Sequence, residues 1–193
     1  MIKKPNKVNN STSHFIELAF EQAKINLGAT GTNPSVGCVV VKNNSIISSG
    51  YTSIKGRPHA EYNSLNKNLN FKGASLYVSL EPCSHYGLTP PCTDIIIKKG
   101  IKKVYFSLND VDPRSAKLAL EKFKSNKIKV KSGFLKKYAE YFYKSYLDKK
   151  KNYLDAKIAI SQDYFTINKK SKWISNEYSL KSCLLYTSPS PRD

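Results

Sequence analysis

The sequence predicts an α/β fold, a three-layer α/β/α sandwich whose central mixed sheet has about five strands. Strand-like and helix-like segments alternate over residues 13–150, which is typical of a sheet covered by helices on both faces. Residues 36–41 are continuously apolar, as in a strand that is buried on both faces. Hydrophobic residues make up 40% of the 193 positions, which is enough for a packed core and argues against wholesale disorder.

The predicted elements follow one another in a regular order. The predicted helices cover residues 13–27, 58 onward, 90–99, 112–125 and 136–150, and the predicted strands cover 36–41, 45–50, 74–80, 104–108 and 128–131. Residues 1–12 are polar and are expected to form a flexible N-terminus. Apolar residues from Phe15 to Leu27 recur at helical spacing, and Gly28 supplies a stop, which defines the first helix. The Asn pair at 43–44 favours a turn, so the first two strands should form a hairpin.

Two helices are predicted to begin at prolines, and both carry reactive side chains near their starts. Pro58 suits the first position of a helix, which places His59 and Glu61 in its first turn. The prolines at 90–91 open another helix, with Cys92 near its start. The N–H groups and dipole at a helix N-terminus favour thiolate over thiol. We therefore expect both helix starts to face a common metal ion.

The remaining elements are predicted from alternation and periodicity. Residues 74–80 alternate between apolar and polar side chains and indicate a half-buried strand, and 104–108 and 128–131 are two further strands. An Asp-Pro pair opens the helix at 112–125. Residues 136–150 carry aromatic side chains among lysines, which favours an amphipathic helix with an aromatic packing face. A nucleic-acid surface remains the alternative for that segment.

Three side chains with metal-ligand chemistry stand in two short segments. His59 precedes Glu61 in a His-Ala-Glu sequence, and Cys83 and Cys92 bound a proline-rich stretch. One imidazole and two thiolates leave the fourth position of a tetrahedral zinc ion for water, as catalytic sites do. Glu61 stands where a proton shuttle is needed. We therefore predict a hydrolytic zinc enzyme with one Zn²⁺ per chain, and interpret Cys38 as a small core residue.

The net charge of +18 is unevenly distributed. Residues 1–97 hold 9 Lys or Arg against 5 Asp or Glu, whereas residues 98–193 hold 23 against 9. Arginine, the residue preferred for bidentate contacts to bases and phosphates, accounts for only 3 of the 32 basic residues. Solvated lysine faces are the preferred interpretation, so nucleic acid is not expected as a partner. A polyanion-binding surface remains the alternative.

The lack of a signal peptide or membrane-spanning segment in the sequence, together with its cysteine usage, predicts a cytoplasmic protein. The sequence has no run of about 18 apolar residues, so no membrane-spanning helix is expected. The N-terminus lacks the apolar middle region of a signal peptide. Four cysteines in a cytoplasmic chain suggest metal binding or catalysis rather than disulfides. We also expect a homo-oligomer.

The order His-Ala-Glu, Pro-Cys, Cys resembles the signature of the zinc-dependent deaminases. In most of them two residues separate the cysteines, whereas Ser-His-Tyr-Gly-Leu-Thr-Pro-Pro separates Cys83 from Cys92. This longer insert resembles the deaminase domain of the bifunctional deaminase/reductases of riboflavin biosynthesis. Residues 32–37 resemble the Asn-Pro-x-Val-Gly segment of the same family. The resemblance covers about residues 13–180 and implies a cytidine-deaminase-like sandwich over residues 13–150.

The resemblance implies a specific reaction on a small pyrimidine ribose phosphate. The family deaminates 2,5-diamino-6-ribosylamino-4(3H)-pyrimidinone 5′-phosphate to the corresponding 5-amino-6-ribosylaminouracil phosphate. Zinc held by His59, Cys83 and Cys92 would lower the pKa of its water toward neutrality. Glu61 would take the proton of that water and return protons to the ring nitrogen and the departing amine.

The resemblance also implies substrate contacts, and two positions depart from it. Asn33 resembles a side chain that hydrogen-bonds the substrate, and His85 a phosphate or ribose contact. A turn residue before proline and a loop-fixing hydrogen bond are the respective alternatives. Leu88 stands where many relatives carry Lys or Arg, which removes a candidate phosphate partner. The segment 112–116 lacks the family's glycines, and Arg114 or a lysine elsewhere could replace the missing charge.

The sequence changes character after the predicted deaminase domain. Residues 151–182 resemble the start of the family's NADP-dependent α/β reductase domain, cut off before most of it. This resemblance implies that Ala159 and Trp173 contact NADP and that Ser171 contacts the substrate. NADP would be a cofactor only if that domain were complete, so we do not expect reductase activity. Residues 183–193 fit no preceding pattern and are interpreted as a non-native tail.

Two other functions remain open from the sequence. A deaminase of cytidine, dCMP or tRNA adenosine would use the same zinc chemistry but normally has two residues between its cysteines. A zinc-stapled binding module without catalysis would need a fourth protein ligand, for which Cys38 and His85 are the nearby candidates. That module would also leave Glu61 without a role.

Overall fold

A computed structural model shows one five-stranded sheet with the strand order β2-β1-β3-β4-β5. The structure describes residues 7–112 and 118–148, which belong to the compact unit Met1–Lys149. The strands are β1 (Gly37–Lys42), β2 (Ser45–Tyr51), β3 (Ser75–Leu80), β4 (Lys103–Leu108) and β5 (Lys129–Lys131). β1 is antiparallel to both of its neighbours, whereas β3, β4 and β5 run parallel, so the sheet is mixed as predicted.

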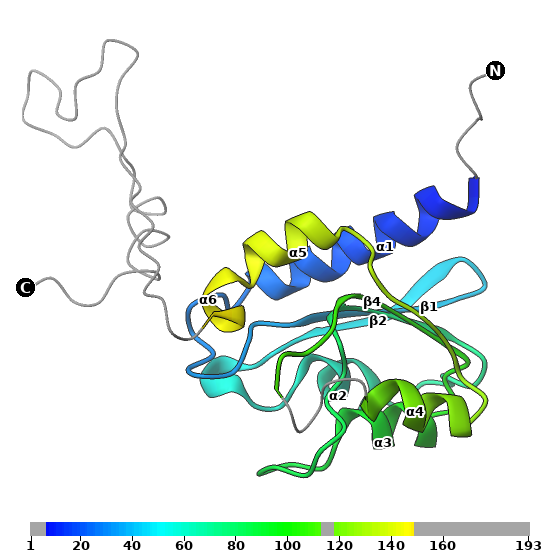
Figure 1. Ribbon diagram of the computed structural model, residues 1–193. Coiled ribbons are helices and arrows are strands. Elements are labelled where there is room, and N and C mark those ends of the chain that lie inside the picture. The colour runs from blue at the N-terminus through cyan, green and yellow to red at the C-terminus, as the bar shows by residue number, and fades with distance from the viewer. Residues whose placement is uncertain (1–6, 113–117, 149–193) are drawn as a thin grey trace, which may run out of the picture. The chain divides into compact units, whose positions relative to one another are not determined.

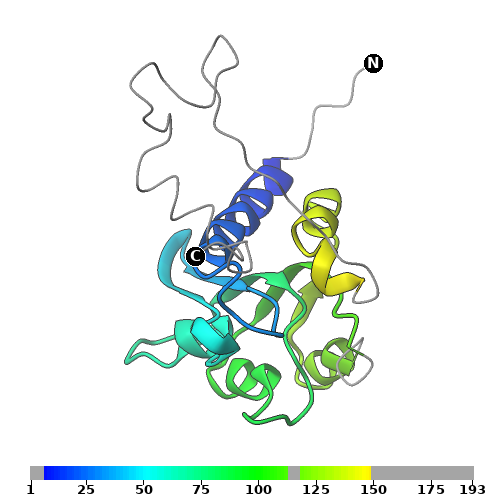
Figure 2. The same cartoon turned by 90° about the vertical axis from the view of Figure 1, so that its left-hand side faces the viewer.

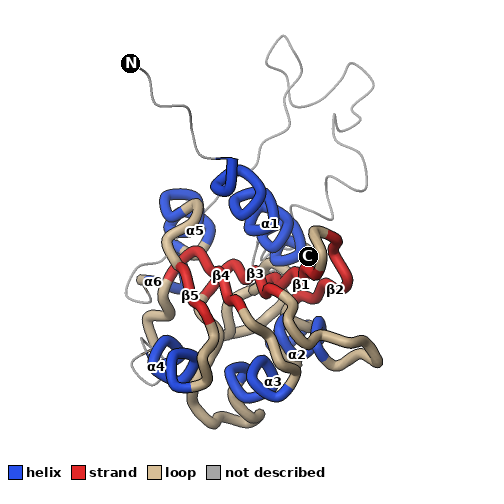
Figure 3. Tube along the Cα trace, turned by 90° about the vertical axis from the view of Figure 1, so that its right-hand side faces the viewer, coloured by secondary structure: helices blue, strands red, loops and turns tan. Residues whose placement is uncertain are grey.

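Helices cover both faces of this sheet. They are α1 (Lys7–Lys24), α2 (Ala60–Leu65), α3 (Cys92–Lys98), α4 (Leu118–Ser125), α5 (Lys136–Phe142) and α6 (Lys144–Leu147), with a short 3₁₀ helix at Ile54–Gly56. Figure 1 and Figure 3 show α1 and α5 on one face and α2, α3 and α4 on the other. In Figure 2 the blue α1 and the yellow α5 lie together above the sheet. The predicted three-layer sandwich is therefore confirmed.

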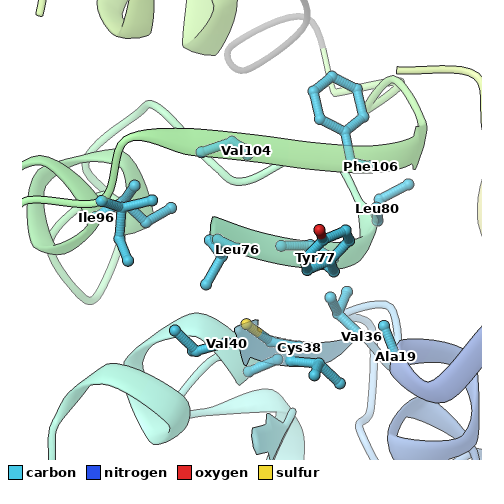
Figure 4. Packing of buried hydrophobic residues seen from close by; sticks show 14 of the residues in the cluster. Ala19, Val36, Cys38, Val40, Leu76, Tyr77, Leu80, Ile96, Val104 and Phe106 are labelled. Carbon is cyan, nitrogen blue, oxygen red and sulfur yellow. The ribbon is translucent and has the colours of Figure 1, made fainter. Parts of the chain in front are cut away.

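The core forms where the apolar face of each helix meets the central strands. Ile16, Phe20 and Ala23 recur at helical spacing along α1, and all three are buried. β1 is buried on both faces, as its continuous apolar sequence predicted. Figure 4 shows Cys38 of β1 among the buried side chains of the core, which include Ala19 of α1 and Leu76 of β3. Cys38 is fully buried, which confirms its interpretation as a core residue.

Three predicted boundaries were wrong in instructive ways. α1 begins at Lys7, inside the segment expected to be flexible, because extending an existing helix costs little and adds one hydrogen bond per residue. Pro58 is not the first residue of α2, since His59 has extended backbone angles and caps a helix that begins at Ala60. The helix expected over 136–150 divides at Tyr143, whose φ and ψ are −97° and 13°.

Several predictions lie outside the residues that the structure describes. They concern Arg114, the reductase-like segment 151–182 with Ala159, Ser171 and Trp173, and the tail 183–193. These stay predictions. Within the described part of the chain, no helix is long and apolar enough to cross a membrane.

Candidate metal centre and substrate pocket

Three elements bring the predicted metal ligands to one end of the sheet. His59 caps α2, Cys83 follows the end of β3, and Cys92 is the first residue of α3. The backbone N–H of Thr93 donates to the Cys83 carbonyl (3.1 Å), which ties the start of α3 to the end of the strand. The ligands thus meet where a strand ends and two helices begin.

A glycine on β2 lets α2 approach closely enough to place its first turn. A Cβ atom at Gly50 would lie 2.5 Å from the Ala60 carbonyl oxygen and 2.6 Å from the Ser64 nitrogen. Any other residue would therefore push α2 away from the sheet. The close contact is reinforced by the Ser48 hydroxyl, which donates to the Ser64 carbonyl at 2.6 Å.

The ligand atoms of His59, Cys83 and Cys92 all lie within 4.8 Å of one another. Nδ1 of His59 is 3.5 Å from the Cys83 sulfur and 3.4 Å from the Cys92 sulfur. A tetrahedral zinc ion with bonds of about 2.0 to 2.3 Å places its ligand atoms roughly 3.5 Å apart. The two measured distances match this spacing, so one nitrogen and two sulfurs fit zinc without rearrangement.

The remaining candidates for a fourth protein ligand do not join this group. Among the described residues, His59, Cys83 and Cys92 form the metal-ligand cluster, and neither Cys38 nor His85 belongs to it. The Cys38 sulfur instead lies 3.2 Å from the Ser64 hydroxyl in the core. A centre with three protein ligands leaves one position for water, as catalytic zinc sites do.

Hydrogen bonds distribute charge unequally between the two thiols. The hydrogen bond from the Cys92 thiol lowers the pKa of Cys83 to about 4, with smaller contributions from His59 and from the Cys92 N–H at 3.3 Å. The same thiol–thiol contact, together with burial, raises the pKa of Cys92. The Cys83 sulfur also raises the pKa of His59. These contacts favour the thiolate form of Cys83.

Glu61 lies beside this cluster and is almost completely buried, with 3% of its surface exposed. Its Oε2 atom accepts a hydrogen bond from the Cys92 thiol at 3.4 Å. Burial, followed by the charge of Cys83, raises the pKa of Glu61 to about 7. A carboxyl group is thus held next to the three ligand atoms, where an acid/base group is required.

One cavity beside the metal cluster brings most of the predicted site residues together. Asn33 and His85 line it together with His59, Glu61 and Cys83. The Asn33 amide nitrogen donates to the Gly56 carbonyl at 3.0 Å, so this side chain also braces the loop before α2. That bond agrees with the alternative role of a loop residue, but it leaves the amide oxygen available to a ligand.

Sequence reasoning missed an acidic wall of the cavity. Glu81, at the end of β3, accepts the backbone N–H of Asp110 at 3.0 Å, and Asp110 follows β4. The Tyr146 hydroxyl donates to Asp110 at 2.7 Å, which attaches α6 to this wall. Their position just past the ends of two parallel strands was the available signal, because ligands bind at that edge of α/β sheets. Arg57, which also lines the cavity, was missed as well.

The cavity, the ligand triad and the buried carboxylate together define a zinc-dependent deaminase, and the sequence agrees. Residues 9–108 match the family described as the cytidine and deoxycytidylate deaminase zinc-binding region. The chain therefore belongs to the cytidine and deoxycytidylate deaminase family.

Within that family the chain belongs with the RibD-like deaminases of riboflavin biosynthesis. It is 38% identical to a diaminohydroxyphosphoribosylamino-pyrimidine deaminase of Buchnera aphidicola subsp. Acyrthosiphon pisum over 71% of this chain and 94% of that protein. It is 39% identical to the riboflavin biosynthesis protein RibD of Aquifex aeolicus over 87% of this chain but 49% of the relative. The chain thus spans about half the length of the RibD relatives that it matches.

A solved structure supports the same assignment. The diaminohydroxyphosphoribosylaminopyrimidine deaminase/5-amino-6-(5-phosphoribosylamino)uracil reductase of Thermotoga maritima is 36% identical and superimposes with a TM-score of 0.73. The similarity covers 90% of this chain and 52% of that one. The cytidine-deaminase-like sandwich that the sequence predicted is therefore confirmed.

Proposed function

We propose that this chain hydrolytically deaminates 2,5-diamino-6-ribosylamino-4(3H)-pyrimidinone 5′-phosphate. One observation carries the proposal. Buried Glu61 lines one cavity with the zinc ligands His59 and Cys83, and the third ligand, Cys92, lies within 4.8 Å of both, in a chain that matches a diaminohydroxyphosphoribosylamino-pyrimidine deaminase over 94% of that relative's length. The product is the corresponding 5-amino-6-ribosylaminouracil phosphate, and the second product is ammonia.

In this proposal His59, Cys83 and Cys92 hold one Zn²⁺. Their spacing and donor chemistry fit that ion, and a bound Zn²⁺ makes water acidic enough to act as a nucleophile near neutral pH. The Cys83 thiolate is stabilised before any metal arrives, since Cys92 donates to it. The deeply buried Cys92 loses its proton only when a cation takes the place of that proton.

Glu61 is the proton-transfer residue of the proposed mechanism. Its carboxylate takes a proton from the attacking water and delivers it to the ring nitrogen next to the amino-bearing carbon. It then takes the second proton of that oxygen and delivers it to the departing amine. One C–O bond forms and one C–N bond breaks, so water and substrate give carbonyl product and ammonia with no redox change. Asn33 and His85 are proposed to hydrogen-bond the substrate from the cavity wall.

Release of ammonia from alternative substrates tests the proposal. The zinc-loaded protein should deaminate the diaminopyrimidine phosphate with a kcat/KM at least 100-fold above those for cytidine, dCMP and tRNA adenosine (roughly 3 kcal/mol of discrimination). Turnover of only the latter three would show that the chain is a nucleoside, nucleotide or tRNA deaminase. No turnover of any of them by a fully zinc-loaded protein would favour a binding module instead.

Further parts of the proposal concern the remaining chain and its setting. We propose a deaminase domain over residues 13–150, the start of a reductase domain over 151–182 and a non-native tail over 183–193. Ala159 and Trp173 would contact NADP and Ser171 the substrate only in a complete reductase domain. We also propose that the protein is cytoplasmic and forms a homo-oligomer. Light scattering on the purified protein would test the oligomeric state.

A further inference from the structure

The cavity beside the metal cluster has an acidic lining, which conflicts with binding a phosphorylated substrate unless a cation offsets it. Four carboxylates line the described cavity, those of Glu61, Glu81, Asp110 and Asp112. Among the same lining residues Arg57 is the only Lys or Arg, and it is charged at every accessible pH. Among the described residues, Arg57 is therefore the permanent positive charge that an anionic group entering this cavity would meet.

Arg57 is held in place by the loop between the two cysteine ligands. Its Nη1 atom donates to the Thr89 hydroxyl at 2.8 Å. Within the described part of the chain, no carboxylate lies within salt-bridge distance of the guanidinium group. A guanidinium group has five N–H donors in a planar fork, so most of them remain available to a ligand. The side chain is thus positioned by a neutral partner and not neutralised by an acid.

Arg57 and His85 place two nitrogen atoms close to the same residue, Gly87. A Cβ atom built on Gly87 would lie 3.6 Å from Nη2 of Arg57 and 3.8 Å from Nε2 of His85. Both side chains also line the cavity beside the metal cluster. A planar guanidinium paired with an imidazole suits a phosphate monoester, whose several oxygens can accept from both.

The loop between Cys83 and Cys92 carries no Lys or Arg that could contact the phosphate. Residues 84–90 contain no Lys or Arg, and the Leu88 side chain is 88% exposed. Among the described lining residues, Arg57 is the Lys or Arg outside the loop, and it lies in the segment between the 3₁₀ helix and α2.

We infer that Arg57 recognises the phosphate group of the substrate, with His85 as the second donor in the same cavity wall. This inference rests on the proposed deaminase function, since it names the residue that selects the phosphorylated form. Arg57 is a specificity-determining residue, and Thr89 is the positioning residue that holds it.

Substitution of Arg57 should lower activity on the phosphorylated substrate but not on the unphosphorylated one. Arg57→Gln should lower kcat/KM for the diaminopyrimidine phosphate by about 10- to 100-fold, mainly through KM, because a charge-assisted pair is lost. The same variant should turn over the dephosphorylated compound as fast as wild type does. Arg57→Lys should recover part of the loss. Lys102→Gln, which removes one exposed charge just before β4, at the far end of the sheet, is the matched control and should change neither value.

Two loop variants test the geometry without removing the charge. Gly87→Ala places a methyl group at ordinary van der Waals distance from Arg57 and His85, so the fold should be kept while the approach of the phosphate to the two nitrogens is narrowed. Its KM should rise only for the phosphorylated substrate. Thr89→Val removes the acceptor that fixes Nη1 and should raise the same KM by a smaller factor.

Binding of ribose 5-phosphate, measured by calorimetry, distinguishes failure of this inference from failure of the proposed function. Wild type should bind the probe, and Arg57→Gln should weaken it at least 10-fold with unchanged zinc content and melting temperature. If wild type fails to deaminate the diaminopyrimidine phosphate, the proposed function fails, yet the binding difference would still support Arg57 as the phosphate residue. Equal binding by both proteins, or equal losses on both substrates, would overturn the inference.

Discussion

The buried reaction centre and the exposed rim of the same cavity are built by different means. Glu61 and Cys92 are each 3% exposed, whereas Tyr86 and Leu88 in the loop between the cysteines are 75% and 88% exposed. The centre is fixed by a strand end and two helix starts that pack on the core. The rim depends on a loop held by a few side-chain contacts, among them the bond from Arg57 to Thr89.

Because of this difference, substitutions at the centre and on the rim should have different effects. A substitution at the centre disturbs ligand distances of 3.4 and 3.5 Å and a buried carboxylate, so it affects chemistry and stability together. A substitution on the rim meets solvent and alters recognition with little cost to folding. The reaction type should therefore be robust in this fold, and the substrate preference should be adjustable at positions such as 57 and 88.

The largest expected effect at the centre is loss of the metal. Cys83→Ser removes one of the clustered ligand atoms, so zinc content should fall from about one per chain to well below ~0.1, as removal of a ligand at a three-residue site demands. Deaminase activity should vanish with it. Elemental analysis and ammonia release measure the two effects. Full activity in a zinc-free protein would contradict a metal centre at these residues.

Replacement of the buried carboxylate should remove chemistry while keeping the metal. Glu61→Gln keeps the size of the side chain but cannot transfer protons, so kcat should fall by about 10²- to 10⁴-fold. Zinc content should stay near one per chain, because Glu61 is not one of the three clustered ligands. Single-turnover ammonia release and elemental analysis test this pair of outcomes. An unchanged kcat would break the assignment of Glu61 as the proton-transfer residue.

Two glycine-to-alanine variants compare the centre and the rim directly. At Gly50 the new methyl group would lie 2.5 Å from the Ala60 carbonyl, so α2 must move and the free energy of unfolding should fall by about 1–3 kcal/mol. At Gly87 the nearest atom is 3.6 Å away, and the change should stay within about 0.5 kcal/mol. Urea unfolding of both variants measures the difference. Equal destabilisation would show that the rim is as constrained as the centre.

Sequence reasoning succeeded where short-range patterns determine the structure. The continuous apolar sequence of β1 and the helical spacing in α1 indicated the layers, and the donor set of His59, Cys83 and Cys92 indicated the metal chemistry. Pro58 misled the placement of α2, because its preference for a first helical position yielded to the extended backbone of His59. Propensity is a weak prior, and tertiary context overrides it.

The missed residues depend on contacts between distant parts of the chain. Arg57 meets Thr89 across 32 positions, and Glu81 meets Asp110 across 29. Neither pair follows a sequence motif, so only the folded backbone brings them together. The sequence placed the replacement for the missing charge at Leu88 at Arg114 or at a lysine elsewhere. Arg114 lies outside the described residues and stays a prediction, and the structure adds Arg57 in the cavity wall as a candidate.

The smallest expected effect is a gain at the rim. Leu88→Lys adds a cation to the loop that lacks one, and its exposed side chain can approach the phosphate beside Arg57. Since exposed charge pairs contribute about 0.2–1 kcal/mol, kcat/KM for the phosphorylated substrate should rise by up to ~5-fold. The gain should disappear at high salt, where such interactions are screened. Leu88→Gln is the neutral control, and the melting temperature should not change in either variant. A similar gain for the dephosphorylated compound would show that the lysine acts on the loop and not on the phosphate. The assignment of substrate recognition to the rim and of the reaction to the centre would then fail.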